Sequence, residues 1–142
     1  MNFLSCCFIL FMSVLAFSAQ EEDAYNEPVK RVIHGQVYEL KDTIEKNREL
    51  LYETWSNRLT LLHYAVIFEQ HECVETILEM SNGLNVNAQD SAGLTPLHYA
   101  VTHSKYLVEL LVLHRADPYI KAHSGFTAID LCSDPDILRF LE

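Results

Sequence analysis

The stretch Thr95-Pro-Leu-His-Tyr-Ala100 decides how this chain folds, because two related stretches flank it. They are Thr60-Leu-Leu-His-Tyr-Ala65 and Thr127-Ala-Ile-Asp-Leu-Cys132, and the three threonines lie 35 and 32 positions apart. A threonine hydroxyl can accept a hydrogen bond from a free N–H in the first turn of a helix. Pro96 suits the next position because it has no N–H to leave unpaired. Each stretch therefore predicts a helix start, and together they predict a repeat protein.

Apolar residues at helical spacing follow each of these starts. They predict an inner helix at 61–68 and an outer helix at 72–80 in the first full repeat, and an outer helix at 107–113 in the second. Upstream, apolar positions on both sides of Gly35 predict a further pair of helices, with the glycine in the tight turn between them. We therefore expect an all-α chain.

The repeats resemble those of the ankyrin family, whose signature is Thr-Pro-Leu-His-x-Ala with a 33-residue period. The connecting stretch Gly83-Leu-Asn-Val-Asn-Ala-Gln-Asp90 is similar to the family's finger sequence. The resemblance implies a short solenoid of helix-turn-helix repeats with finger-like turns. It also implies that His63 and His98 tie one turn to the next by hydrogen bonds, which is in doubt where Asp130 replaces the histidine. Asn87 resembles the finger asparagine that intracellular hydroxylases modify in this family.

Six segments follow from these patterns. They are a signal peptide at 1–18, an acidic disordered segment at 19–28, a degenerate N-terminal capping repeat at 29–54, full repeats at 55–89 and 90–122, and a truncated C-terminal capping repeat at 123–142. Terminal repeats of a solenoid are atypical because one side of each faces water.

The first 19 residues contain no charged side chain, and the apolar run from Phe8 to Phe17 ends in Ser18 and Ala19. This pattern predicts a secretory signal peptide cleaved after Ser18. Two alternatives stay open: an uncleaved helix at 3–19 that anchors the chain in a membrane, and a cytoplasmic protein with an unusual N-terminus. A membrane span needs about 20 apolar residues, which makes this stretch short for an anchor.

The formal charge of −10 in 142 residues indicates the class of partner. An anionic chain is repelled by phosphate backbones and by anionic membrane surfaces, and its ten Lys and Arg residues are scattered. We therefore expect a protein partner, no nucleic acid and no small-molecule substrate, with membrane contact only if the leader is retained. We expect a monomer.

Catalytic and metal chemistry is not predicted. Cys73 and Cys132 fall on core positions two repeats apart, too far for a disulfide, and they lack the electropositive, exposed setting of a reactive thiol. His63 and His98 lie one repeat apart, about 8 to 10 Å, which is too far for two ligands of one zinc ion. The sequence has no phosphate-binding loop or hydrolase motif. We expect no enzyme, no cofactor and no metal.

The predicted binding surface is the concave face, which repeat proteins use for partners. By position in the family's repeat, this face comprises Ser56, Asn57, Leu59, Ile67, Phe68, Ser91, Ala92, Leu94, Thr102, His103, His123, Ser124 and Phe126. Apolar side chains at Leu59, Leu94 and Phe126 predict a strip flanked by polar residues. The alternative is that these side chains only cover neighbouring repeats, or that the N-terminal segment folds over them.

Together these patterns predict a secreted interaction module that binds a protein through its concave face, and the leader suggests an exported effector. The alternative is an intracellular or membrane-tethered adaptor or inhibitor. In both cases the mechanism is occupancy without turnover.

Overall fold

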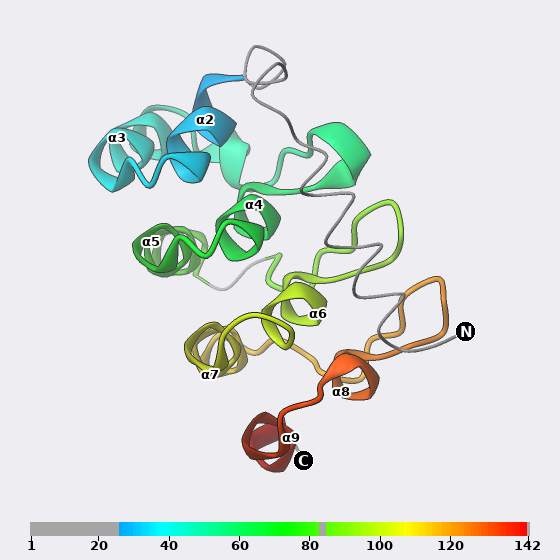
Figure 1. Cartoon of the computed structure of the whole chain (residues 1–142). Coiled ribbons are helices and arrows are strands. Elements are labelled where there is room, and N and C mark those ends of the chain that lie inside the picture. The colour runs from blue at the N-terminus through cyan, green and yellow to red at the C-terminus, as the bar shows by residue number, and fades with distance from the viewer. Residues whose placement is uncertain (1–25, 83–84, 142) are drawn as a thin grey trace.

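The computed structural model describes residues 26–82 and 85–141 of the chain, and this part consists of helices and turns. The helices form two rows that run down the stack (Figure 1). The inner row contains α2, α4, α6 and α8, and the outer row contains α3, α5, α7 and α9. The finger-like turns project on the side of the inner row. This arrangement is the predicted all-α solenoid.

The helices have the following bounds: α2 Glu27–Ile33, α3 Val37–Lys46, α4 Leu61–Ile67, α5 His71–Ser81, α6 Pro96–Ala100, α7 Lys105–Leu113, α8 Ala128–Leu131 and α9 Pro135–Leu141. Two short 3-10 helices lie between α3 and α4, namely η2 at Arg48–Leu51 and η3 at Ser56–Arg58. In the inner row α4 contacts α2 and α6, and α6 contacts α8. In the outer row α5 contacts α3 and α7.

The predicted helices agree with the structure to within two residues at each end. The predicted inner helix at 61–68 is α4, and the outer helices predicted at 72–80 and 107–113 are α5 and α7. Gly35 lies between α2 and α3 with φ 63°, the left-handed conformation that favours glycine. One boundary is wrong: α2 begins at Glu27, so residues 27 and 28 of the segment predicted to be disordered are helical. Pro28 suits the first turn because that turn needs no N–H from it.

The core lies between the two rows and continues from repeat to repeat. The fifth residue after each signature threonine is small, and Ala65, Ala100 and Cys132 at this position are all buried. Small side chains there let neighbouring inner helices approach closely. The outer helices contribute the other side of the core through residues such as Leu78 and Leu111, which are completely buried. The two rows therefore share one hydrophobic core.

The predicted signal peptide at 1–18, and positions 19–25 of the acidic segment, lie outside the described residues. Within the described ranges, no helix has the length and apolar character needed to cross a membrane.

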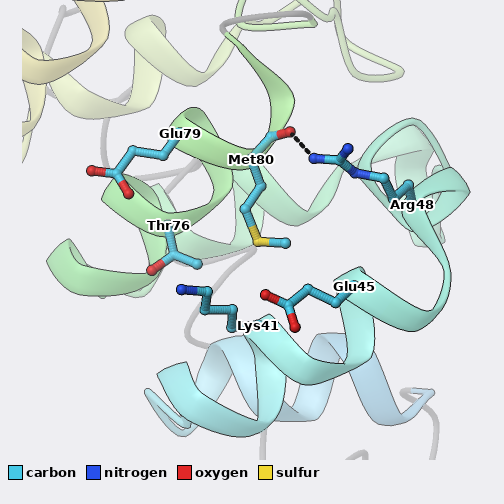
Figure 2. Close-up of a pocket in the computed structure, with 6 residues that line it drawn as sticks. All are labelled: Lys41, Glu45, Arg48, Thr76, Glu79 and Met80. Carbon is cyan, nitrogen blue, oxygen red and sulfur yellow. Dashed lines mark hydrogen bonds between the residues drawn. The ribbon is translucent and has the colours of Figure 1, made fainter.

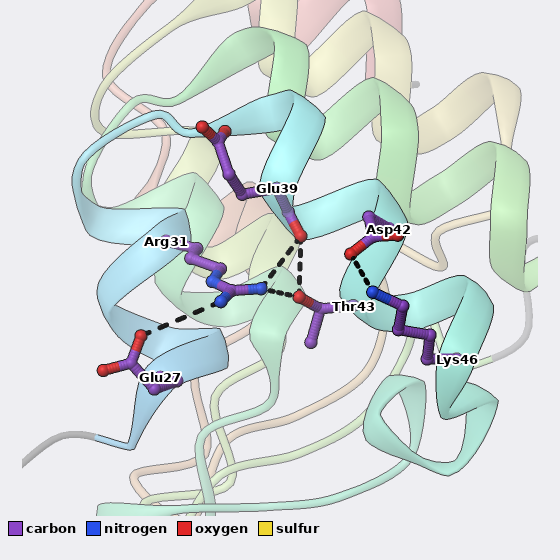
Figure 3. A network of polar contacts seen from close by, with 6 residues as sticks. All are labelled: Glu27, Arg31, Glu39, Asp42, Thr43 and Lys46. Atoms are coloured by element: carbon purple, nitrogen blue, oxygen red, sulfur yellow. Dashed lines mark hydrogen bonds and ion pairs between the residues drawn. The ribbon is translucent and has the colours of Figure 1, made fainter.

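The N-terminal pair α2–α3 lacks the threonine signature. A network of hydrogen bonds around Arg31 joins its two helices instead (Figure 3). The Arg31 guanidinium donates to the Glu39 carbonyl at 3.1 Å and to the Thr43 hydroxyl. The Thr43 hydroxyl donates in turn to the same Glu39 carbonyl at 2.6 Å. Because Arg31 lies on α2 and the other two lie on α3, these bonds link the two helices. A Glu27 carboxylate 3.9 Å from the guanidinium adds an ion pair within α2.

The Arg31 network generates a stability prediction. Replacing Arg31 with alanine removes the bonds to α3, and we expect the free energy of unfolding to fall by about 1 kcal/mol. The matched control is Lys46→Ala, which removes an exposed ion pair between Lys46 and Asp42, both on α3. That loss should be within about 0.5 kcal/mol, because exposed ion pairs contribute little. Urea unfolding followed by circular dichroism measures both. Equal losses in the two variants would show that Arg31 does not join the helices.

Candidate functional site

The two full repeats start with the same arrangement of a threonine and a histidine. The Thr60 amide donates to His63 Nδ1 at 3.2 Å, and the Thr95 amide donates to His98 Nδ1 at 3.1 Å. The threonine hydroxyls lie 2.9 and 2.8 Å from the same nitrogens. A backbone amide can only donate, so Nδ1 is an acceptor in both rings and the ring proton is on Nε2. Both histidines are therefore neutral, with one fixed donor that points away from their own helix.

That donor joins each repeat to the next finger. His63 Nε2 donates to the Leu94 carbonyl at 3.1 Å, and His98 Nε2 donates to the Phe126 carbonyl at 3.3 Å. In both cases the accepting carbonyl belongs to the residue just before the next signature threonine. The structure thus confirms the hydrogen-bonding role predicted for the two histidines, and these bonds place successive fingers in a fixed register.

At the third copy, Asp130 reproduces only half of this arrangement. Its Oδ2 accepts from the Thr127 amide and from the Thr127 hydroxyl, each at 2.8 Å. These are the bonds that a histidine Nδ1 makes in the other copies. A carboxylate offers no counterpart to the Nε2 donor. Asp130 therefore closes the helix start of α8 and provides no donor for a further finger. The bonds from Thr127 also lower the pKa of the Asp130 carboxyl.

Burial lowers the pKa of both histidines. For His63, which is completely buried, desolvation outweighs the hydrogen bond to Leu94 and the charge of Asp90, both of which favour the protonated ring. For His98 the same order of causes holds, with desolvation first and the hydrogen bond to Phe126 second. Protonation would also place a proton on Nδ1, where the threonine amide already donates. The hydrogen bonds from His63 and His98 to the next finger therefore require the neutral imidazole.

The second finger, Asp90 to Leu94, is built around the buried Asp90 carboxylate. Its Oδ1 accepts from the amides of Ala92 and Leu94, each at 2.9 Å. Its Oδ2 accepts from the Tyr99 hydroxyl at 2.6 Å. Burial, with this bond as the second cause, raises the pKa of Tyr99. The carboxylate is thus satisfied from its own finger and from α6, which holds the finger against the inner helix.

The three described fingers, at residues 55–59, 90–94 and 122–126, are also joined directly through their backbones. The Ser91 amide donates to the Asn57 carbonyl at 2.8 Å, and the His123 amide donates to the Ala92 carbonyl at 2.9 Å. Gly93 permits the second contact, because a Cβ there would lie 2.7 Å from the His123 amide nitrogen and φ is 77°. The predicted site residues of all three fingers are therefore brought into one row.

The sequence-predicted site residues differ in exposure. Ser56, Asn57, Ser91, Ala92, Thr102, His123, Ser124 and Phe126 are exposed, whereas Leu59, Ile67, Phe68 and His103 are half-buried. Leu94 is 5% exposed, so the predicted apolar strip through Leu59, Leu94 and Phe126 is wrong at its centre. The Leu94 carbonyl accepts from both His63 and Asp90, which draws this residue into the gap between repeats. Phe126, at the last described finger, stays 37% exposed.

The remaining predicted residues form a second group at the other end of the inner helices. Ile67 and Phe68 end α4, and Thr102 and His103 occupy the equivalent turn after α6. His103 Nδ1 lies 3.7 Å from the carboxylate of Glu69, which joins the two turns. The sequence-based prediction did not include Glu69. Its position directly after Phe68, in the same turn, could have indicated it. The predicted surface is therefore two clusters, the finger row and the turn group, separated by the length of the inner helices.

The finger asparagine has a structural role. Asn87 Nδ2 donates to the Arg115 carbonyl at 3.2 Å, and its Oδ1 accepts from the Asp117 amide at 2.8 Å. Asn87 thus holds the loop after α7 against the preceding finger, one repeat away.

The two cysteines in the described part of the chain lie in the core. Cys73 and Cys132 are both buried free thiols. Burial raises the pKa of Cys73 to about 11, and burial likewise raises the pKa of Cys132. Thiolate, the nucleophilic form, is therefore disfavoured at both positions. Among residues 26–82 and 85–141, no group of three or more metal-ligating side chains comes together.

Comparison with known proteins identifies the same repeats. A family model described as ankyrin repeats in three copies matches residues 15–122. The chain is 40% identical over 84 residues to the Caenorhabditis elegans ankyrin repeat and LEM domain-containing protein 1 homolog, covering 56% of this chain and 12% of that protein. It is 43% identical over 75 residues to the human 2-5A-dependent ribonuclease, covering 51% and 10%. It is 30% identical over 108 residues to the palmitoyltransferase AKR1 of Lachancea kluyveri, covering 72% and 13%. The chain thus spans 13% or less of the length of each of these relatives.

The neutral histidine ties generate a pH prediction. Above the unfolded pKa of about 6.5 both states are neutral, and the full stability is present. As the pH falls below 6.5, the unfolded chain takes up protons that the folded one resists, so stability is lost by up to about 1.4 kcal/mol per pH unit for each histidine. We expect His63→Gln to lower the free energy of unfolding at pH 7.5 by about 1 to 3 kcal/mol and to flatten its decrease between pH 6.5 and 5.

The control is His34→Gln, which makes the same change at an exposed histidine. Urea unfolding at several pH values gives the slopes. His34→Gln should keep the slope of the wild type, and a His63→Gln slope as steep as the wild type would contradict a neutral buried tie.

Proposed function

The chain belongs to the ankyrin-repeat family, and on that premise we propose that it binds a protein partner with the exposed residues of its finger row and turn group. Ankyrin repeats indicate a protein–protein interaction module, and the family is generally not enzymatic. The observation that carries the proposal is the hydrogen-bonded finger row. A surface whose backbone is already fixed loses little conformational entropy on binding.

The side chains of the two clusters suit a protein interface. Phe126 in the finger row and Phe68 in the turn group supply aromatic surface, and aromatic residues are enriched at protein interfaces. Exposed polar residues such as Asn57, Ser91 and His123 accompany Phe126 along the fingers. An apolar anchor with a polar surround is the usual anatomy of a contact surface.

We propose occupancy as the mechanism, without chemical turnover. Two relatives are named a ribonuclease and a palmitoyltransferase, and this chain matches 10% and 13% of their lengths. The disfavoured thiolates of Cys73 and Cys132 support a binding role over cysteine chemistry. We propose a protein partner and a monomeric chain, with neither nucleic acid nor a small-molecule substrate.

We propose further that the chain is secreted, and that it acts outside the cell that makes it, as an exported effector. The support is the uncharged, apolar N-terminal stretch that ends in Ser18 and Ala19. The alternative role is an adaptor or inhibitor that is membrane-tethered if the leader is retained, or intracellular if the stretch is not a leader.

The binding surface is tested by two substitutions, Phe68→Ser and Phe126→Ser. Each should weaken partner binding at least tenfold, because removing an aromatic anchor commonly costs more than 1.4 kcal/mol of binding free energy. Phe140→Ser on α9 is the control, since Phe140, at 44%, is exposed to an extent similar to Phe126, at 37%, and lies in neither cluster. Proteins captured from cell extracts and from extracellular medium are compared by mass spectrometry, and affinities for the captured protein follow by calorimetry.

The supporting result is a protein captured by the wild type and by Phe140→Ser and lost with both other variants, while circular dichroism shows intact helices. Capture that persists in Phe68→Ser and Phe126→Ser would refute the assignment of the surface.

The leader is tested by sequencing the N-terminus of the chain recovered from the medium of producing cells. Cleavage after Ser18 gives Ala19 as the first residue. Detection of Met1 or Cys6 in the mature chain, or recovery of the chain only from the cell fraction, would exclude the secreted form and favour the adaptor.

A further inference from the structure

A groove of about 460 Å³ lies between the outer helices (Figure 2), and its lining residues belong to neither cluster of the proposed binding surface. It runs between α3 with η2 on one side and α5 on the other, where the degenerate repeat meets the first full repeat. Its lining residues are Lys41, Glu45, Arg48, Thr76, Glu79 and Met80. The Met80 thioether points into the space between the helices. An adaptable apolar side chain thus lies among charged ones.

The four charged residues balance each other in number and yet form no ion pair. Lys41 and Arg48 are cationic, and Glu45 and Glu79 are anionic. The ion pairs within 4.0 Å in the described part of the chain involve other residues. Lys41 and Glu45 are four positions apart on α3, a spacing at which opposite charges can meet. Arg48 alone is fixed, because its Nη2 donates to the Met80 carbonyl at 3.1 Å.

These charges restrict what the groove can bind. A simple anion would be attracted by Lys41 and Arg48 and repelled by the two glutamates. A simple cation would be attracted by the glutamates and repelled by Lys41 and Arg48. A wholly apolar ligand would bury charges without pairing them, which costs free energy. The remaining class of ligand carries both positive and negative charges around an apolar group that can contact Met80.

We propose that this groove is a second protein-binding site, and that its occupant is a partner helix with one apolar side chain flanked by acidic and basic residues. The acidic residue pairs with Lys41 and the free donors of Arg48, and the basic residue pairs with Glu45 or Glu79. A helix fits because the groove lies between the neighbouring helices α3 and α5, as in other helix-in-groove interfaces. A small zwitterion would keep much of its surface in water here, because the four charged side chains are exposed.

The probe is a displayed library of helical peptides, each with one leucine or methionine and random charged neighbours. The library is selected on the purified chain, and the best peptides are synthesised. Binding is followed by the NMR signal of the Met80 methyl group. We expect enriched peptides to carry both signs of charge beside the apolar residue and to shift that signal.

Charge reversal tests the pairing. Lys41→Glu and Glu79→Lys should each weaken the selected peptide at least tenfold, and a peptide with its charges exchanged should regain affinity for the double variant. The matched controls are Lys105→Glu and Glu109→Lys, which make the same changes at an ion pair on α7 outside the groove. These controls, and Phe68→Ser on the other surface, should leave peptide affinity unchanged.

Three results would overturn the proposal. The first is a library that yields no peptide able to shift the Met80 signal. The second is a peptide whose affinity survives Lys41→Glu and Glu79→Lys, or is lost with Phe68→Ser. The third is a Met80 signal that responds to free lysine or glutamate and to no peptide, which would assign the groove to small zwitterions. None of these results depends on the partner of the finger row.

Discussion

The hydrogen bond from a neutral histidine to the carbonyl of the next finger is the interaction on which the stack depends. His63 and His98 each use one ring nitrogen to fix the start of their own helix and the other to hold the following finger. The helix start and the repeat spacing are therefore set by one side chain. Since the accepting carbonyls belong to Leu94 and Phe126, the ties also decide how the fingers lie and which of their side chains face water.

The same reasoning explains how the third copy of the signature differs from the other two. Asp130 accepts the two bonds from Thr127 that fix the helix start, so α8 begins as the other inner helices do. A carboxylate has no donor to offer a further finger. Exchanging histidine for aspartate thus keeps the local function of the position and removes its long-range one. At the other end, where the threonine signature is missing, Arg31 joins α2 to α3 through backbone and hydroxyl acceptors.

Much of the fold was predictable from the sequence because the repeated signature is local. Threonine, proline and histidine act within one helical turn, and apolar spacing sets the helices, so the bounds of α4, α5 and α7 were predicted closely. The burial of Leu94 was not predictable, because its carbonyl accepts one bond from His63 in the preceding repeat as well as one from Asp90 within its own finger. The Arg31 network and the groove around Met80 were missed for a similar reason. They join residues of different helices in the part of the chain where no signature repeats.

The ties also determine how the stack responds to acid, because two effects of acidification oppose each other. A chain with a formal charge of −10 repels itself less as carboxylates take up protons, and this favours the folded state. That relief comes mainly near the carboxylate pKa values of about 4 and is weakened by salt, since exposed charges are screened within about 8 Å at physiological ionic strength. The cost at His63 and His98 begins near pH 6.5 and is not screened, because both rings are buried. Between pH 6.5 and 5 the histidines therefore dominate, and the free energy of unfolding falls while most carboxylates are still charged.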